Sequence, residues 1–380
     1  MNDLIVGIDA SRNRSGGARA HIIGLLTSGD PLKHGVKEVH LWAFKTLLDS
    51  IPDQKWLVKH NPRELEQSLS RQLWWQATKL SREILLTSCD ILFSTDASTL
   101  CRFSPMVVLS QDMLSYEPGV MKYFGYTKAR LRLLAILFLQ NYAFRYSDGV
   151  IFLTKYASKV IQRSCGALQR TALIPHGVGE DFKSINLGKR LHSEMRPIRC
   201  LYVSNTEMYK HQWVVVSAIQ KMRKRGHNVT LTLIGDGFGK AQQLLNKQCI
   251  ASDPKSEFIE KIGFVPQKEL PRKMASADIF IFASSCENMP VTLIEAMAVG
   301  LPIACSNRGP MQEVLADGGI YFDPEDEESI AIAIEQIILN PDHKIRIAKR
   351  AKTLSEQYSW LRCSNETWEF IVKVYKDIKK

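Results

Sequence analysis

The chain has 380 residues, of which 45% are hydrophobic and 23% charged, so its composition is that of a soluble globular protein with about two domains. No run reaches the roughly 18 consecutive apolar residues of a transmembrane helix, and the start MNDLIVGIDAS lacks the features of a signal peptide. Eight scattered cysteines without a CxxC pair argue against a zinc site or a disulfide framework. We therefore expect a cytoplasmic protein with free thiols and no bound metal.

The net charge of +11 is concentrated in the N-terminal half, since residues 1–180 carry 22 Lys/Arg against 15 Asp/Glu. A basic surface suits an anionic membrane or phosphorylated ligands, and it can equally be an ordinary solvated surface. No DNA- or RNA-binding motif is present, so we do not expect nucleic acid as a partner.

In the N-terminal half, short apolar runs predict buried strands, and two longer segments predict helices at 62–87 and 127–146. The first of these helices begins with Pro62, which suits the first helical position. The predicted strands are 4–10, 91–95, 105–110 and 149–154.

The C-terminal half alternates apolar strands with helices, a rhythm that predicts βαβ units and a parallel sheet covered on both faces. The polar segment 179–197 predicts a domain boundary, and the tail 341–380 is helical throughout. The predicted strands are 198–204, 229–235, 278–284, 302–306 and 319–323, and the predicted helices are 212–225, 238–248, 267–276, 290–299 and 310–316.

In open α/β sheets, ligands bind beyond the carboxyl ends of the strands, so the residues that follow strands are the first candidates for a site. After the first strand, Gly16-Gly17 opens a helix close to Arg12, Arg14 and Arg19. A glycine turn before a helix can hold a phosphate, and it can also be an ordinary tight turn.

Two further positions in the N-terminal half leave both a functional and a structural interpretation open. Asp112 and Glu117 follow the strand 105–110 and could bind a hydroxyl, act as a base, or cap the next element. His176 stands with Gly177 where the two halves join, and a histidine in a linker is often structural.

In the C-terminal half, Lys210 is expected near the start of a helix, where the macrodipole disfavours a cation unless an anion lies between them. A plain surface lysine is the alternative. The segment LIGDGFGK places Gly235, Gly237 and Gly239 in a GxGxG pattern, which is not the dinucleotide fingerprint GxGxxG. We interpret it as a strand-to-helix turn near a ligand.

The stretch SSCENMPVTLIEAMAVGLP places Glu287 before a helix and Glu295 about five residues inside it. The intervening N–H groups, from Asn288, Met289, Val291 and Thr292, lie in the loop and first turn, where helical partners are missing. They predict an anion cradle with a carboxylate on either side. The structural alternative is a helix with a favourable acid near its start and one buried, salt-bridged glutamate.

The stretch ENMPVTLIEAMAVGLP resembles the E-x7-E motif of retaining GT-B glycosyltransferases of family 4, the glycosyl transferases group 1. Further segments are similar to those of the same family: SGGARAH to its N-domain glycine loop, IPHGV to its interdomain crossing, GFVPQKEL to its nucleobase-side loop, and YSW to the residues before its last helix. The resemblance covers nearly the whole chain and is weakest over 30–88.

This resemblance implies an α/β GT-B architecture, with two Rossmann-like parallel-sheet domains that face an interdomain cleft. The expected N-terminal domain is 1–182, with the last helix, 361–380, packing back on it. The expected donor domain is 193–360. The donor would be a nucleoside-diphosphate sugar, with no cofactor and no metal.

The resemblance also assigns roles to particular residues. Glu287 would bind the donor sugar and Glu295 the ribose, while Lys210 would neutralise the leaving diphosphate. The remaining donor contacts implied are Gly17, Asn288, Met289, Pro290, Val291, Gly235, Gly237, Phe264 and Val265. Asp112, Arg14 and His176 are acceptor-side or interdomain candidates.

Four positions depart from the family pattern. Ser204-Asn205 stands where an arginine usually precedes the lysine, so one phosphate contact is lost or is supplied from elsewhere, for example by Arg14. Asn288 replaces a frequent glycine, and His176 replaces an asparagine. Gln111 precedes Asp112 where many members have histidine, which puts a catalytic role for this pair in doubt.

The resulting hypothesis is a retaining, metal-independent hexosyltransferase that acts on a glycan or lipid-linked acceptor in surface polysaccharide or lipopolysaccharide assembly. The alternatives are a non-catalytic GT-B-like protein that binds a sugar nucleotide or glycan, and a nucleotide-sugar epimerase. The tract EPGVMKYFGYTKARLRLLAILFLQ could rest on the inner face of an anionic membrane, or it could be a core-packing helix with a solvated basic side.

Overall fold

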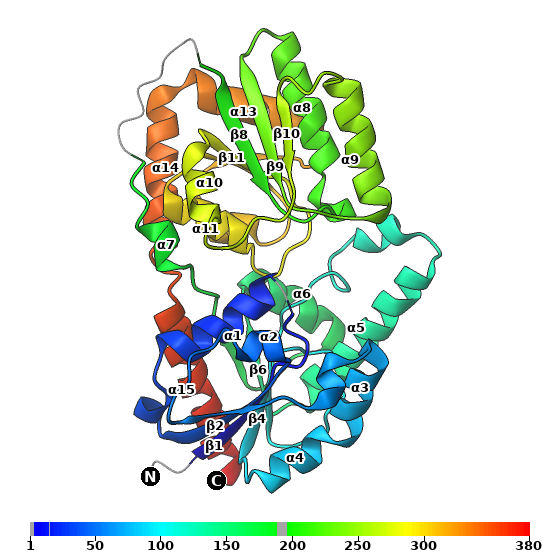
Figure 1. The fold of residues 1–380 in the computed structure, drawn as a ribbon, viewed down its shortest axis with the longest axis vertical. Coiled ribbons are helices and arrows are strands. Elements are labelled where there is room, and N and C mark those ends of the chain that lie inside the picture. Colours follow the sequence, from blue (N-terminus) through cyan, green and yellow to red (C-terminus); the bar gives the residue numbers. More distant parts are fainter. Residues whose placement is uncertain (1–3, 15, 188–195) are drawn as a thin grey trace. The chain divides into compact units, whose positions relative to one another are not determined.

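The computed structural model describes residues 4–14, 16–187 and 196–380, and the chain divides into two compact units (Figure 1). Unit 1 comprises Met1–Gly177 together with Tyr358–Lys380, and unit 2 comprises Val178–Gln357. The predicted start of the second domain at residue 193 and Ser15 of the glycine loop lie outside the described residues.

Unit 1 is built on a seven-stranded parallel sheet in the order β3-β2-β1-β4-β5-β6-β7. The central strands β1, β4, β5 and β6 were expected from their apolar runs, and their side chains are almost entirely buried. The strands are β1 Leu4–Asp9, β2 Val36–Trp42, β3 Leu57–His60, β4 Ile91–Ser94, β5 Met106–Leu109, β6 Gly149–Phe152 and β7 Thr171–Leu173.

Helices of unit 1 cover this sheet, and the C-terminal helix α15 packs against α1, where the Ser364 hydroxyl donates to the Leu25 carbonyl at 2.7 Å. The α-helices are α1 Gly16–Ser28, α2 Lys45–Leu48, α3 Leu69–Thr78, α4 Leu80–Leu86, α5 Lys128–Tyr146, α6 Lys155–Cys165 and α15 Trp360–Lys379. The 3₁₀ helices are η1 Pro31–His34, η2 Arg63–Glu66 and η3 Val120–Phe124.

The single helix predicted over 62–87 is wrong, because the segment forms η2, α3 and α4 instead. Hydrogen bonds from elsewhere in unit 1 hold η2 in place: Arg14 donates to the Leu65 carbonyl at 2.6 Å, and the Lys45 N–H donates to Glu66 at 2.6 Å. Ser68 then takes an extended conformation before α3 begins. These tertiary contacts outweigh the helical propensity of the segment.

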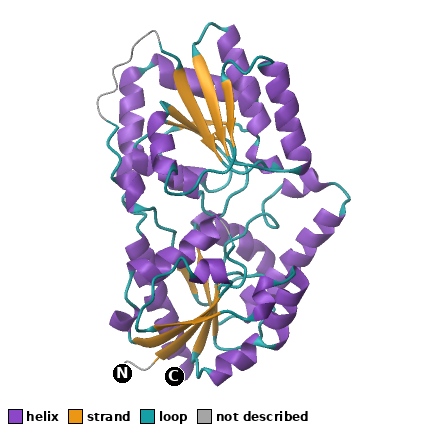
Figure 2. Ribbon diagram, viewed as in Figure 1, coloured by secondary structure: helices purple, strands orange, loops and turns teal. Residues whose placement is uncertain are grey.

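Unit 2 contains a six-stranded parallel sheet in the order β10-β9-β8-β11-β12-β13, and Figure 2 shows the strands of each sheet between helices. The two parallel α/β sheets predicted from the sequence are therefore confirmed. The strands are β8 Ile198–Val203, β9 Val229–Ile234, β10 Ile259–Ile262, β11 Ile279–Phe282, β12 Ile303–Ser306 and β13 Ile320–Phe322.

The five helices predicted between the strands of unit 2 are present within a few residues, except that the one predicted at 238–248 continues to Ser252. The helices α7, η4 and α13 were not predicted, and the tail predicted as helical throughout is interrupted at 356–359, between α14 and α15. The helices of unit 2 are α7 Glu180–Lys183, η4 Met208–Lys210, α8 Gln212–Lys224, α9 Gly239–Ser252, α10 Leu270–Ser276, α11 Val291–Val299, α12 Met311–Leu315, α13 Glu327–Leu339 and α14 Pro341–Ser355.

Each sheet has one point where the chain order reverses, and such switch points are where ligands bind in open α/β sheets. In unit 1 the reversal lies between β1 and β4, and in unit 2 it lies between β8 and β11. The loops after these four strands define the two regions in which a site is expected.

All eight cysteines are buried free thiols, as the sequence predicted. Within the described residues, no helix is both long enough and apolar enough to cross a bilayer.

Candidate functional site

The loop after β8 carries Lys210 at the switch point of unit 2, and three hydrogen bonds fix the backbone there. The Tyr202 hydroxyl, from β8, donates to the Lys210 carbonyl at 2.8 Å. Ser285, in the loop after β11, donates its N–H to the Tyr209 carbonyl at 2.8 Å and pairs through its hydroxyl with the His211 ring at 2.8 Å. The two loops that flank the switch point are thus joined to each other.

Lys210 and Glu287 form an ion pair across the switch point, one from each of these loops. Their side chains are only 10% and 15% exposed. A lysine is rarely this buried without an opposite charge, and its position is fixed because leaving either partner alone would be costly. The pair places a cation and a hydrogen-bond-accepting carboxylate at the edge of the sheet.

Helix α11 begins at Val291, four residues after Glu287, and its first turn has N–H groups without helical partners. The N-cap position is held by Pro290, which makes no side-chain capping bond. Val291 and Thr292 are the first helical residues, so no earlier carbonyl of the helix accepts from them. Such an uncapped N-terminus carries partial positive charge and can hold a phosphate, which is the cradle that the sequence predicts.

Glu295 lies one turn further along α11 and is almost completely buried, with 3% of its surface exposed. Its Oε1 accepts from the Gln267 amide at 2.6 Å, whereas its Oε2 is buried with no hydrogen-bond partner. Burial raises the pKa of the carboxyl to about 8, although the Gln267 bond opposes this shift. An unsatisfied buried oxygen costs free energy, so Oε2 of Glu295 is a hydrogen-bonding position that no described residue fills.

The two glycines predicted to lie near a ligand allow the loop after β9 to approach the loop after β8. A Cβ on Gly235, whose φ is +119°, would lie 2.2 Å from the Ser204 carbonyl oxygen, and a Cβ on Gly237 would lie 2.4 Å from Thr206. Neither contact is sterically tolerable, so both positions require glycine.

The loop after β10 contains the predicted nucleobase-side residues. Phe264 is 81% exposed and its N–H donates to Asp236 at 2.8 Å, while Val265 is buried. The same loop supplies Gln267, which joins it to Glu295 on α11. The loop after β10 therefore carries both the exposed ring of Phe264 and the hydrogen-bond partner of the buried Glu295.

The position of the missing arginine is occupied by a neutral network. Ser204 accepts through both its hydroxyl and its carbonyl from the Gln212 amide, at 3.0 and 3.1 Å. The loop after β12 carries a further cation, Arg308, which pairs with Asp323 at 2.8 Å. The next residue, Gly309, lies against the Glu287 loop, since a Cβ placed there would be 4.0 Å from the Glu287 nitrogen.

Sequence reasoning missed four residues that surround this site: Gln267, His211, Ser285 and Arg308. Gln267 could have been suspected, because it lies in the quoted segment GFVPQKEL, but its contact with Glu295 spans 28 positions. The other three occupy loops at the carboxyl ends of strands, which is their only signal in the sequence.

At the switch point of unit 1, the polar groups are bound mainly to one another. Buried Asp9 accepts from the Gln76 amide at 2.6 Å, and Arg12 pairs with Asp96 at 3.1 Å. Asn13 donates to the Ala18 carbonyl and accepts from the Thr95 hydroxyl, at 2.9 and 2.8 Å.

The predicted candidates of unit 1 lie in three different settings. Gly17 is in the first turn of α1, and Arg14 packs over the Phe44 ring while donating to the Leu65 carbonyl. Asp112 accepts from the Leu114 N–H at 2.8 Å in a turn and does not cap the next helix, η3, whose N-cap is Gly119, and burial raises the pKa of Asp112. His176 is buried beside the rings of His21 and Trp360, and its two ring nitrogens have no hydrogen-bond partner.

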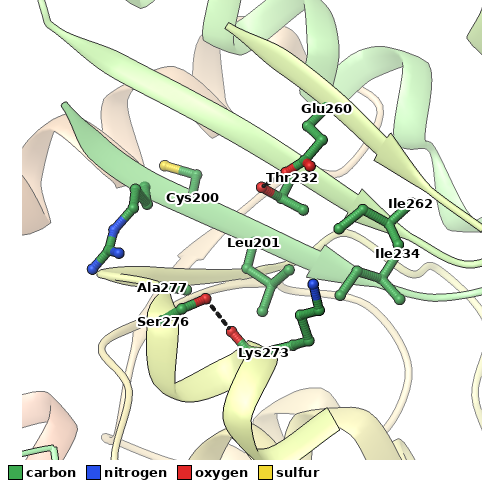
Figure 3. A pocket seen from close by; sticks show the side chains of 10 residues that line it. Cys200, Leu201, Thr232, Ile234, Glu260, Ile262, Lys273, Ser276 and Ala277 are labelled. Atoms are coloured by element: carbon green, nitrogen blue, oxygen red, sulfur yellow. Dashed lines mark hydrogen bonds between the residues drawn. The ribbon is translucent and has the colours of Figure 1, made fainter. Parts of the chain in front are cut away.

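A small pocket of about 80 Å³ lies on the face of the unit 2 sheet beside α10, between residues that include Leu201, Thr232, Glu260 and Lys273 (Figure 3). Its volume corresponds to only a few water molecules. It opens on the face of the sheet, so it is distinct from the candidate site at the carboxyl ends of the strands. Among the residues that the structure describes, no cluster of three or more His, Cys, Asp or Glu could hold a metal ion.

Residues 186–354 match the family model described as "Glycosyl transferases group 1". An O-antigen chain mannosyltransferase B of Escherichia coli is 27% identical over 167 residues, which cover 44% of each chain. The amylovoran biosynthesis glycosyltransferase AmsK of Erwinia amylovora is 31% identical over 163 residues, 41% of this chain and 38% of the relative. The matched region thus spans less than half the length of these relatives.

Solved structures resemble the chain over almost its full length. Sucrose-phosphate synthase from Thermosynechococcus elongatus has a TM-score of 0.78 at 16% identity and covers 99% of both chains. Anabaena HepE, solved in complex with UDP-glucose, has a TM-score of 0.71 at 17% identity, over 99% of this chain and 100% of HepE. At this level of identity the likeness establishes the fold, and the GT-B fold expected from the sequence is confirmed.

Proposed function

Because residues 186–354 match the glycosyl transferases group 1 family model, we propose that the chain is a retaining, metal-independent glycosyltransferase. It transfers a sugar from a nucleoside-diphosphate sugar to a glycan or lipid-linked acceptor. The observation that carries the proposal is Glu295, a fully buried carboxyl that has one oxygen satisfied by Gln267 and the other without a partner. We assign a ribose hydroxyl of the donor to the Oε2 atom that lacks a hydrogen-bond partner.

The diphosphate of the donor is assigned to the start of α11 and to Lys210. The N–H groups of the first turn bind the phosphate oxygens, and the lysine offsets the charge that develops on the leaving group. Arg308, in the loop after β12, is our candidate for the part of the arginine replaced by Ser204, because the neighbouring Gly309 lies against the Glu287 loop. Lys210 and Arg308 supply positive charge for this step, which is why the proposed transfer is metal-independent.

Glu287 is assigned to the hydroxyls of the transferred sugar. In the ligand-free arrangement its carboxylate is held by Lys210. When donor binds, the lysine is shared between this carboxylate and the diphosphate, so the sugar and the leaving group are positioned by one ion pair. The acceptor hydroxyl attacks the anomeric carbon from the side of the leaving group, and the bond from this carbon to the diphosphate breaks. The hydroxyl gives its proton to a phosphate oxygen. Attack from this side retains the anomeric configuration.

The cellular role proposed is assembly of a surface polysaccharide. It is supported by the names of two relatives, an O-antigen chain mannosyltransferase and an amylovoran biosynthesis glycosyltransferase. Asp112 and Arg14 remain the candidates for acceptor contacts, and Phe264 and Val265 the candidates for the nucleobase.

A second candidate function, a non-catalytic protein that binds a sugar nucleotide, is favoured by one observation, the neutral Ser204–Gln212 network where the family carries an arginine. Release of nucleoside diphosphate from UDP-, GDP- and ADP-sugars, with and without candidate acceptors, separates the functions. Release that requires an acceptor supports the transferase. Binding without release for every pair supports the binding protein, and sugar turnover without an acceptor indicates an epimerase.

A thermal-shift screen of the same sugar nucleotides identifies the donor before any acceptor is known. A donor at about 100 times its Kd raises the free energy of unfolding by about 2.7 kcal/mol, which gives a clear increase in Tm. If no sugar nucleotide shifts the Tm of the full chain, the donor site proposed here is wrong.

A further inference from the structure

Two histidine rings and a tryptophan ring form a buried cluster in unit 1. His21, in the middle of α1, and His176, which follows β7, are 1% and 3% exposed, and their ring centroids lie 4.8 Å apart. Trp360, the first residue of α15, has its ring centroid 6.3 Å from that of His21 and 5.7 Å from that of His176. The cluster therefore joins three segments that are far apart in the sequence.

The four ring nitrogens of His21 and His176 have no hydrogen-bond partner among the described residues. A neutral imidazole has one N–H donor and one acceptor, whereas a protonated one has two donors and a positive charge, so burial without partners penalises the protonated form most. Burial lowers the pKa of His21 to about 4 and that of His176 well below its ordinary value. Both rings are therefore neutral at neutral pH.

No carboxylate of the described residues accepts a hydrogen bond from either ring, so a proton on the cluster would have no counter-charge in contact with it. The charged residues on or next to the elements that pack against the rings have partners elsewhere. They are Arg19 of α1 with the Thr46 carbonyl at 3.3 Å, Asp96 after β4 with Arg12 at 3.1 Å, and Arg362 of α15 with Glu366 at 2.9 Å.

The cluster lies where the chain leaves unit 1, after Gly177, and where it returns, before Tyr358. A Cβ on Gly177 would lie 2.2 Å from the Trp360 nitrogen, so the departing and returning backbones touch. A Cβ on Gly24 would lie 2.3 Å from the Trp360 ring, so α1 and the start of α15 are in equally close contact. Close packing around the two histidines thus holds both chain crossings against α1.

We propose that this cluster is an acid-sensitive latch, which holds segment 174–177 and the start of α15 against α1 while both imidazoles are neutral and releases them when either takes up a proton. Release exposes the charged ring to water and removes the cost of burying it. Segments at the boundary of a unit can open locally while the central strands stay folded. His176 replaces an asparagine of the family pattern, which cannot titrate, so the latch is a feature of this chain.

Acid favours the open state of the latch. The pKa values of both rings in the native state lie below the ordinary 6.5, so the closed state has its full stability above pH 6.5 and loses it progressively as the pH falls toward 4. Between pH 7 and pH 5, each histidine that is released multiplies the equilibrium constant for opening by about 20, and the two together multiply it by about 400.

Hydrogen exchange of the full chain, followed by mass spectrometry at pH 7, 6 and 5, tests the proposal. The opening constants of peptides that cover 174–178 and 358–364 are obtained after correction for the intrinsic exchange rate at each pH. We expect them to rise by about 20- to 400-fold from pH 7 to pH 5, while those of β4 and β5 change by less than about five-fold.

Two results of this experiment would overturn the latch. The first is an opening constant for 174–178 and 358–364 that does not change with pH. The second is an equal rise across the whole of unit 1, which would indicate global unfolding instead of local release.

Single variants show whether these two histidines are responsible. His176→Asn and His21→Asn each remove one titrating ring, so each should reduce the rise between pH 7 and pH 5 by about 20-fold. His343→Asn, at a half-buried position of α14 in unit 2, is the matched control and should keep the wild-type rise. A wild-type rise in His176→Asn and His21→Asn overturns the assignment. The Tm at pH 7 shows that each variant folds, and if one does not, the other decides.

The ring ¹⁵N chemical shifts of selectively labelled histidines report the protonation directly, with His21 and His176 assigned by the signal that each variant lacks. Both rings should be neutral at pH 6 in the native protein, because neither has a partner for a second proton. A protonated ring of either residue in the native state at pH 6 would contradict the proposal. None of these measurements uses a sugar nucleotide, so the latch is tested independently of the proposed transferase function.

Discussion

The two switch points of this chain both have polar and charged residues in the loops after their strands, but they differ in how many of these polar groups have hydrogen-bond partners. In unit 1, between β1 and β4, Asp9, Arg12 and Asn13 are each bound to a partner in the same unit. In unit 2, between β8 and β11, the start of α11 is uncapped by its N-cap residue and Glu295 keeps one buried oxygen without a partner.

This difference separates polar groups that serve the fold from polar groups that are available to a ligand. Both loops carry charged residues at the carboxyl end of a parallel sheet, so position alone does not distinguish them. Unsatisfied hydrogen-bonding capacity at the switch point distinguishes them, because a buried oxygen without a partner costs free energy that a ligand hydroxyl can offset. The predictions below change one side of the comparison at a time.

The largest effect is expected for Lys210→Ala. Loss of the cation that we assign to the leaving diphosphate should reduce kcat by about 10² to 10³, as for other single groups that stabilise transition-state charge. The kcat of the variant is measured in steady-state assays, with the donor that thermal shift identifies. Lys221→Ala is the control, since Lys221 is also ion-paired, to Glu327, but lies on α8 away from the switch point, and its kcat should match that of the wild type.

Glu287→Ala should mainly impair transfer. Its carboxylate is assigned to the sugar, so the variant should lose about ten- to a hundred-fold in kcat while the Kd of the free nucleoside diphosphate changes little. Measuring both quantities on one preparation separates the two effects. A variant that lost nucleotide affinity but kept kcat would reverse the roles assigned to the two glutamates.

Glu295→Gln tests the unsatisfied carboxyl without any ligand. The pKa of about 8 in the native state exceeds the ordinary 4.5, so the native state binds the proton more tightly and the wild type loses stability as pH rises from 4.5 to 8. The amide side chain of the variant does not titrate between pH 4.5 and pH 8. Its free energy of unfolding relative to the wild type should increase by about 3 kcal/mol between pH 5 and pH 8.

Denaturant melts of both proteins across this pH range give the difference directly, because all other titrating groups are common to the two. A difference that stayed constant with pH would mean that Glu295 has an ordinary pKa and is not desolvated.

The smallest effect is expected in unit 1. Asn13→Ala removes one hydrogen bond to the Ala18 carbonyl and one from Thr95, so it should lower the free energy of unfolding by about 1 to 3 kcal/mol. Nucleotide affinity should stay within about two-fold of the wild type, since the group is bound within the fold. A large loss of nucleotide affinity at unchanged stability would remove the distinction between the two switch points.

The central strands were predictable because buried parallel strands are continuously apolar. Four strands were not predicted, and three of them, β3, β7 and β10, are at the edges of their sheets. The strand β7 has only three residues, none of them buried, and the sequences of β3 and β10, LVKH and IEKI, carry polar residues on a partly exposed face. The strand β2 has Lys37 and Glu38 directly after its first residue, and these polar residues interrupt its apolar run.

Within the site, the local geometry of Glu287 and Glu295 could be derived from the helix start between them, but their partners could not. Gln267 reaches Glu295 across 28 positions, and Arg14 reaches the Leu65 carbonyl across 51. Likewise, the sequence of α5 is apolar on several sides, so only the packing of Leu133 and Phe144 shows which side is left exposed.

Calorimetric titration of UDP, GDP and ADP into the wild type and Glu295→Ala tests the central claim most directly. The account predicts that one of these nucleotides binds the wild type and that Glu295→Ala weakens its binding by at least about ten-fold, because a desolvated hydrogen bond is lost. Asp317→Asn, at an exposed ion pair with Arg350, should bind as the wild type does. Equal affinity of the wild type and Glu295→Ala for every nucleotide would contradict the account.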